Sequence, residues 1–169
     1  MVSERIQEAL NEQIKHELQA AYLYLGMMAY FESRSLSGFG NWMRIQAQEE
    51  VSHAMRLVDF LLDRGGRVTL HSIDAPSTDF GSPLEVVRAT LHHEERVTGT
   101  INDVYALAVA EKDYPAQVLM QWFVAEQVEE EKSAGELVDQ LELAGDSATA
   151  LLVLDERLAG RTLEPEVTE

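Results

Sequence analysis

Four long segments repeat apolar residues at the 3.6-residue spacing of an α-helix, and polar residues interrupt each repeat near its middle. The segments cover residues 3–32, 38–64, 83–111 and 114–143, and a shorter segment of the same character covers residues 146–159. All four prolines lie between these segments, after them, or in the first turn of one, where a residue without a backbone N–H is tolerated. The sequence therefore predicts an all-α protein.

Residues at the segment ends predict how the helices are connected. Ser3 and Ser82 are suited to cap helix N-termini, and Pro83 follows Ser82 at the first helical position. Gly65 and Gly66 are suited to end the second helix. The polar stretch from residue 66 to 82 is long enough to run the length of a helix. We expect an up-down-down-up four-helix bundle with one long crossover between helices 2 and 3, a short fifth helix, and a single domain covering residues 1–169.

Charge and composition exclude several classes of function. The chain has 13 Lys and Arg against 30 Asp and Glu, a formal net charge of −17, which disfavours nucleic-acid and anionic-membrane partners and favours cations. It has no cysteine, so thiolate nucleophiles and thiolate metal sites are excluded. The charged N-terminal segment does not resemble a secretory signal, and the 12-residue uncharged stretch at 20–31 is too short to span a bilayer. We expect a cytoplasmic protein.

The polar interruptions point to a metal site. They fall at one level of the predicted bundle and comprise Glu17, Glu50, His53, Glu94, Gln127 and Glu130. Buried glutamates are costly unless a cation compensates them, and no Lys or Arg lies on these apolar repeats near that level. A multivalent metal ion would supply the missing positive charge. The sequence therefore predicts a carboxylate-rich metal centre inside the bundle.

The spacing of these residues repeats within the chain. Glu50 and His53 are three residues apart, which places both on one face of a helix. Glu17 and Glu50 are 33 residues apart, as are Glu94 and Gln127, so the second half repeats the first with an offset of 77. This pattern predicts two related helical hairpins packed around a shared centre.

With the stretches YLYLGMMAYFE, GFGNWMRIQAQEEVSHAMRLVDFLLDRGGRV and LMQWFVAEQVEEEKSAGELV, this pattern resembles the non-haem ferritins of bacteria and archaea over essentially the whole chain. The resemblance implies the ferritin-like fold and an iron-storage protein with ferroxidase activity. Such a protein oxidises Fe(II) with O2 or H2O2 and deposits ferric mineral inside a homo-oligomeric cage of 24 subunits. Val51 stands where bacterioferritins carry a haem-binding methionine, so no haem is expected.

The resemblance also implies a dinuclear iron centre with assigned ligands. Glu17, Glu50 and His53 would hold the first iron, and Glu50 would bridge to the second. The second iron would be held by Glu94 and Glu130.

Further residues around the centre match the family. Gln127 would lie beside the second iron as a hydrogen-bonding or weakly ligating group, and Tyr24 and Trp122 match aromatic residues near the centre. A third iron site would share Glu130 and add the carboxylates Glu49, Glu126 and Glu129. The remaining histidines, His16, His71, His92 and His93, are expected on the surface or in loops.

Two alternatives to a storage cage fit the same residues. One is a non-storing dimetal oxidase or metal-buffering bundle in a smaller oligomer, and the other is a purely structural bundle whose stability does not depend on metal. The short fifth helix favours the cage, because its apolar residues Leu151, Leu154 and Leu158 must be buried at the end of the bundle or in an interface.

Overall fold

The computed structural model describes residues 1–77 and 79–163, a part of the chain that contains five helices and no strand. The helices are α1 (Glu4–Ser33), α2 (Ser37–Asp63), α3 (Pro83–Ala110), α4 (Tyr114–Ala144) and α5 (Ala148–Leu158). Every end lies within two residues of its predicted position, so the all-α prediction is confirmed. Residues 164–169 of the predicted domain lie outside the described part of the chain. None of the described helices combines the length and apolar character needed to cross a lipid bilayer.

The helix ends are fixed by the residues that the sequence suggested. The Ser3 hydroxyl accepts a hydrogen bond from the backbone N–H of Ile6 at the start of α1. At the start of α3, Ser82 and Glu85 each accept a hydrogen bond from the other's backbone N–H, and Pro83 follows the cap. Gly65 follows α2 with a φ of 68°, a conformation that glycine adopts without a steric penalty.

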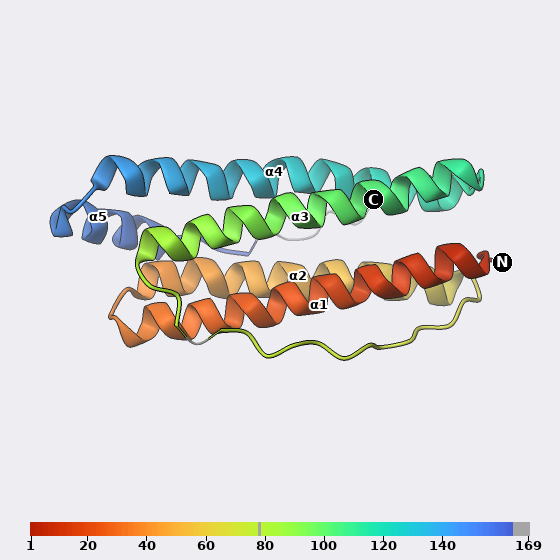
Figure 1. Cartoon of the computed structure of the whole chain (residues 1–169), viewed down its shortest axis with the longest axis horizontal. Helices are drawn as coiled ribbons and strands as arrows, with labels where there is room; N and C mark the ends of the chain where they lie inside the picture. Colours follow the sequence, from red (N-terminus) through yellow and green to blue (C-terminus); the bar gives the residue numbers. More distant parts are fainter. Residues whose placement is uncertain (78, 164–169) are drawn as a thin grey trace.

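Four long helices lie side by side, and α5 lies at one end of the bundle (Figure 1). The hairpins α1–α2 and α3–α4 are each antiparallel, and the segment between α2 and α3 returns along α1 to the opposite end of the molecule. Consequently α2 and α3 run in the same direction, and the predicted up-down-down-up arrangement with one long crossover is confirmed.

Side chains of α1 hold the crossover in place. Asn11 donates to the carbonyl oxygen of Arg67 at 3.0 Å and accepts from the backbone N–H of Thr69 at 2.9 Å. Gln19 makes the same pair of bonds with Asp74, donating at 2.9 Å and accepting at 2.6 Å. These amide side chains satisfy backbone groups of a segment that has no helical hydrogen bonds of its own.

Two apolar clusters fill the bundle, one toward each end. The cluster toward α5 includes Phe31, Phe39 and Met43, while the cluster toward the chain N-terminus includes Leu10, Leu57, Ile101 and Phe123. On all four long helices, the predicted metal-site residues lie in the sequence between the members of these clusters. Apolar residues of α5 join the first cluster, as predicted for Leu151, Leu154 and Leu158. The polar layer is therefore enclosed by apolar packing on both sides.

Candidate metal centre

The polar layer lies deep inside the bundle and draws side chains from all four long helices. Its members are buried and comprise Glu17, Glu50, His53, Glu94, Gln127 and Glu130. Glu94 has no exposed surface, and Glu130 is the most exposed of the six at 8%. Burial of this many carboxylates requires compensation within the layer, because an isolated buried charge is strongly unfavourable.

The half of the layer on α1 and α2 forms a compact group of donor atoms. Glu17, Glu50 and His53 each offer a ligand atom, and these atoms lie within 4.8 Å of one another. His53 Nδ1 lies 3.5 Å from Glu50 Oε2 and 3.8 Å from Glu17 Oε2. Gln13 Nε2 donates to the other oxygen of Glu17 at 2.7 Å and fixes that carboxylate. We call Glu17, Glu50 and His53 the first half-site; two carboxylates and one imidazole suit a divalent transition metal.

Protons balance the charge of the first half-site. Burial acts to lower the pKa of His53, but the neighbouring carboxylates of Glu17 and Glu50 raise it well above its usual range. Burial acts to raise the pKa of Glu17, but the neighbouring His53 and Glu50 and the hydrogen bond from Gln13 lower it. Burial raises the pKa of Glu50 well above its usual range. In the metal-free fold these shifts favour the protonated forms of His53 and Glu50 and the ionised form of Glu17.

This arrangement differs from the cluster expected from the sequence. Four ionised glutamates were expected to meet without any cationic partner, because no Lys or Arg lies on the apolar repeats. In the folded chain the His53 ring lies beside Glu17 and Glu50, and its raised pKa favours the protonated, positively charged form there. Binding of a metal ion through this imidazole requires loss of that proton.

The half of the layer on α3 and α4 is held by neutral hydrogen-bond donors. The Tyr24 hydroxyl donates to one oxygen of Glu94, and Gln127 Nε2 donates to the other at 3.2 Å. Gln46 Nε2 donates to Glu130 at 2.7 Å. Burial, together with the charge of Glu130, raises the pKa of Glu94 to about 7. We call Glu94, Gln127 and Glu130 the second half-site.

Two aromatic residues predicted beside the centre lie there. Tyr24 is completely buried, and burial together with the Glu94 charge raises the pKa of its hydroxyl well above the usual range, so the group stays a donor. The Trp122 ring meets the His53 ring edge-on, with 5.4 Å between ring centroids. The Arg56 guanidinium lies over the Trp122 ring, with its carbon Cζ 3.9 Å from the ring centre.

The residues predicted for a third iron site surround a separate cavity of about 370 Å³. Its lining includes Glu49, Glu126, Glu129 and Glu130, so Glu130 lies between this cavity and the second half-site. Burial raises the pKa of Glu49 to about 7, although the neighbouring Arg161 acts to lower it. We call this space the carboxylate cavity.

Three residues at the site were not identified from the sequence. Gln13 and Gln46 each lie four residues before a predicted ligand on the same helix, and this spacing was the available signal. Arg161 reaches Glu49 from beyond α5, with 2.8 Å between Nη2 and Oε2. No periodic pattern predicts that contact, because it depends on where the chain turns after its last helix.

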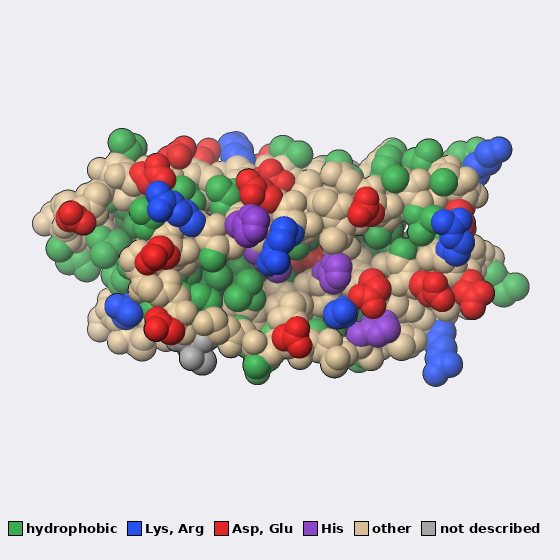
Figure 2. All heavy atoms as spheres, in the orientation of Figure 1, with side chains coloured by type: hydrophobic (Ala, Val, Ile, Leu, Met, Phe, Trp, Pro, Cys, Tyr) green, Lys and Arg blue, Asp and Glu red, His purple; other side chains and the backbone are tan. Residues whose placement is uncertain are grey.

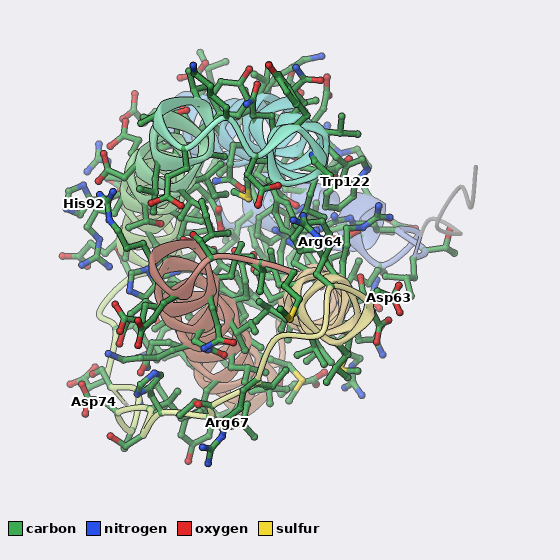
Figure 3. All side chains as sticks on the ribbon, turned by 90° about the vertical axis from the view of Figure 1, so that its right-hand side faces the viewer. Asp63, Arg64, Arg67, Asp74, His92 and Trp122 are labelled. Atoms are coloured by element: carbon green, nitrogen blue, oxygen red, sulfur yellow. The ribbon has the colours of Figure 1, made fainter. Side chains whose placement is uncertain are left out.

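The expectation that His93 is a surface residue is wrong. Its side chain is 8% exposed, and its ring meets that of Tyr24 edge-on at 5.9 Å. Burial lowers the pKa of His93 to about 4, so it is neutral beside Arg96. Its neighbour His92 is exposed on the outer side of α3 (Figure 3), and histidines gather near the middle of the face that includes α1 and α3 (Figure 2). His93 lies on the side of α3 that faces α1, where its ring contacts Tyr24.

Comparisons with known proteins identify the family of the chain. The family model described as a ferritin-like domain matches residues 7–144. The bacterial non-heme ferritin of Bacteroides fragilis is 41% identical over 161 residues, which cover 95% of this chain and all of the relative. The corresponding protein of Staphylococcus aureus is 36% identical over 166 residues, 98% of this chain and all of that one.

Solved structures give the same result. An open-pore ferritin from the archaeon Archaeoglobus fulgidus superposes with a TM-score of 0.95 at 47% identity, covering 96% of this chain and 100% of that chain. An engineered closed form of the same ferritin also gives a TM-score of 0.95 at 47% identity, covering 97% and 100%. The match extends through the fold and covers nearly all of this chain. This chain therefore belongs to the ferritins, in the group that includes the bacterial non-heme ferritins.

Proposed function

We propose that this ferritin stores iron by oxidising Fe(II) at the buried polar layer and depositing Fe(III) as mineral inside a multisubunit cage. The observation that carries the proposal is the buried Glu17–Glu50–His53 group, whose ligand atoms all lie within 4.8 Å. Carboxylate and imidazole ligands suit Fe(II), and a carboxylate-rich environment stabilises Fe(III) still better because of its higher charge. Iron is here both the substrate and the cargo.

The two half-sites would each take one iron. Glu17, Glu50 and His53 would bind the first, and Glu94 and Glu130 the second, with Glu50 as the bridge. The charge of Glu94 acts on the pKa of Glu50, which supports a shared centre. Two Fe(II) ions would supply two electrons together, reducing O2 to H2O2 or H2O2 to water without releasing a one-electron product. Protons held by His53 and Glu50 would leave as iron binds.

Gln127 and the carboxylate cavity complete the proposal. Gln127 would orient Glu94 through its 3.2 Å hydrogen bond and lie beside the second iron. Glu49, Glu126 and Glu129, with Glu130 shared, would bind a third cation in the carboxylate cavity. Because Glu130 borders both spaces, this third cation would lie next to the dinuclear centre.

A cage of 24 subunits is the proposed assembly. Apolar side chains on the outer side of α5 support it, since Leu152 and Val153 are 59% and 62% exposed in the single chain and would be covered by neighbouring subunits. Size-exclusion chromatography with light scattering tests this directly. A 24-subunit assembly of 19.0 kDa chains has a mass of roughly half a megadalton, whereas a dimer or tetramer would favour a non-storing oxidase or metal buffer.

The proposal includes no haem. The position of the haem-binding methionine in bacterioferritins is occupied by Val51, whose side chain has no atom that can ligate iron. Protein purified from cells supplied with a haem precursor should show no Soret absorption band. Such a band in stoichiometric amount would contradict this part of the proposal.

The decisive experiment is aerobic addition of Fe(II) to the metal-free protein. At two Fe(II) per chain, near-ultraviolet absorbance should report rapid oxidation, and after heavy loading electron microscopy should show dense cores within soluble particles. Glu17→Ala should slow the rapid phase about 100-fold, because it removes a ligand. Glu8→Ala, which removes an exposed carboxylate from the same helix, is the matched control and should have no effect. Equal rates in both variants, or loading without cores, would contradict the proposal.

A further inference from the structure

The chain after α5 turns back and is fixed to α2. Asn41 of α2 donates from Nδ2 to the carbonyl oxygen of Leu158 at 3.2 Å and to that of Arg161 at 3.0 Å. Seen along the bundle, α5 lies on the side of α2 and α4, away from His92 and the crossover (Figure 3). This anchoring brings the Arg161 side chain to the carboxylate cavity.

The Arg161 guanidinium occupies a defined position at that cavity. Its Nη2 lies 2.8 Å from Glu49 Oε2, and its Nη1 donates to Gln46 Oε1. Its carbon Cζ lies 5.1 Å from the centre of the Trp42 ring. The Gln46 amide continues the chain of contacts, because its Nε2 donates to Glu130 at 2.7 Å. Arg161 is thereby linked directly to Glu49 and through one side chain to Glu130.

These contacts create a conflict with a cation in the same cavity. Glu49 would have to serve both the guanidinium and the metal ion, and two positive charges a few ångströms apart repel each other. A guanidinium stays protonated at all ordinary pH values and offers no lone pair to a metal. His53 at the first half-site differs, since it can release its proton and become a ligand. Arg161 can only move away.

We propose that Arg161 is a built-in counterion of the carboxylate cavity that competes with the third cation for Glu49. This inference rests on the proposed function, which places a third cation there. In the metal-free protein Arg161 compensates the carboxylates and keeps the segment after α5 against the bundle. Binding of a cation displaces the guanidinium from Glu49, so the third site is weaker than the other two and its occupancy loosens this segment.

The test is anaerobic calorimetric titration of the assembled metal-free protein with Zn(II), comparing wild type with Arg161→Gln. The variant should bind the third equivalent about tenfold more tightly, while the affinities of the first two change less than twofold. Arg161→Lys keeps the charge and should bind the third equivalent nearly as weakly as wild type. Arg157→Gln is the matched control, because it also removes one positive charge from this part of the chain. Arg157 lies in α5 and donates to Gln140 rather than to a residue of the carboxylate cavity.

Hydrogen exchange of residues 158–161 gives an independent readout. In wild type the third equivalent of Zn(II) should speed exchange there several-fold, and in Arg161→Gln exchange should no longer respond to it. Third-site affinity that is unchanged or lower in Arg161→Gln would overturn the inference and leave Arg161 as an anchor. Two tight equivalents without a third in either protein would overturn it by removing the third site. Absence of all three would instead refute the proposed iron centre.

Discussion

The two hairpins of this ferritin place polar residues at matching positions yet compensate their buried carboxylates differently. In α1–α2, His53 lies within 4 Å of both Glu17 and Glu50, and these carboxylates raise its pKa well above the usual range. In α3–α4 the corresponding position is Glu130, and neutral groups from three helices satisfy the carboxylates instead. The first hairpin therefore contains an imidazole that can carry a positive charge, whereas the second depends on amide and hydroxyl donors.

This difference predicts an order of metal binding. The first half-site already gathers three ligand atoms within 4.8 Å and needs only to lose protons. The second half-site must bring two carboxylates, each held by a hydrogen bond to a different partner, onto one ion. We expect the first cation to bind at Glu17, Glu50 and His53, and the second to depend on the first.

The largest expected effect is the loss of His53. His53→Ala removes a ligand of the first half-site, and we expect the initial rate of Fe(II) oxidation at two Fe(II) per chain to fall about 100-fold. Gln127→Ala removes a neutral side chain from the second half-site. It should lower the same oxidation rate tenfold or less, because the glutamine orients Glu94 through an uncharged hydrogen bond. Stopped-flow absorbance measures both rates, and circular dichroism checks the fold. Equal losses would show that the half-sites are not distinct.

The second prediction concerns the stability of the metal-free protein with pH. The pKa of Glu94 is about 7 in the folded chain against an ordinary value of 4.5, so the folded state binds this proton more tightly. The contribution of this protonated carboxyl to the free energy of unfolding is fully present below pH 4.5. It is lost as pH rises through 7, by about 3 kcal/mol at most. His53, whose pKa is also raised, acts in the same direction, while Glu17, whose pKa is lowered, contributes above pH 4.5 and loses that contribution in acid.

Glu94→Gln isolates this effect. The variant keeps the shape and cannot ionise, so its thermal midpoint in chelator should fall less than that of wild type between pH 5 and pH 8. Glu95→Gln, an exposed neighbour on the same helix, should behave like wild type. If Glu94→Gln loses as much stability as wild type over this range, Glu94 is already ionised at pH 5 and the compensation by neutral donors is stronger than described.

The third prediction removes one neutral donor. Tyr24→Phe deletes the hydroxyl that donates to Glu94 and leaves the ring packing in place. We expect the second cation to bind up to tenfold more weakly, since a hydrogen bond to a charged group contributes about 1.5 kcal/mol or more. The first cation should bind with unchanged affinity. Calorimetric titration with Zn(II) resolves the two steps, and a weakening of the first step alone would contradict the assigned partners.

The fold was predictable from the sequence because it depends on local and periodic features. Helical spacing, the Ser3 and Ser82 caps and the long polar crossover determined the five helices and their directions. The polar layer was predictable for the same reason, since each of its members interrupts an apolar repeat. The compensation of its charges was not, because the proton on His53 depends on how closely Glu17 and Glu50 approach it in space.

Residues that reach the site from outside the four apolar repeats were also beyond sequence analysis. Arg161 follows the last helix, and only the turn fixed by Asn41 brings it to Glu49. His93 was misjudged because a histidine next to a ligand can face either way, and helix packing decides which. Both cases show that an apolar repeat predicts which face of a helix turns inward, whereas residues beside that face and contacts between elements depend on the assembled fold.

The smallest expected effect comes from two glutamines with equivalent roles. Gln13 donates to Glu17 in the first half-site and Gln46 to Glu130 in the second, each at 2.7 Å. Gln13→Leu should weaken the first cation less than twofold, because His53 also holds Glu17. Gln46→Leu should weaken the second cation about fivefold, because a hydrogen bond to a carboxylate is lost there without a neighbouring imidazole to replace it.

Gln46 also accepts from Arg161, so its substitution must be separated from release of that guanidinium. Comparing Gln46→Leu with Arg161→Gln and with the double variant forms a cycle that isolates the bond to Glu130. If the fivefold loss persists in the Arg161→Gln background, Gln46 acts by holding Glu130 for the second cation. If it disappears there, Gln46 acts by positioning Arg161, and the second half-site is then compensated by a distant cation. The two hairpins would then be alike in principle, because each would rely on a positive charge. They would differ only in where along the chain that charge lies.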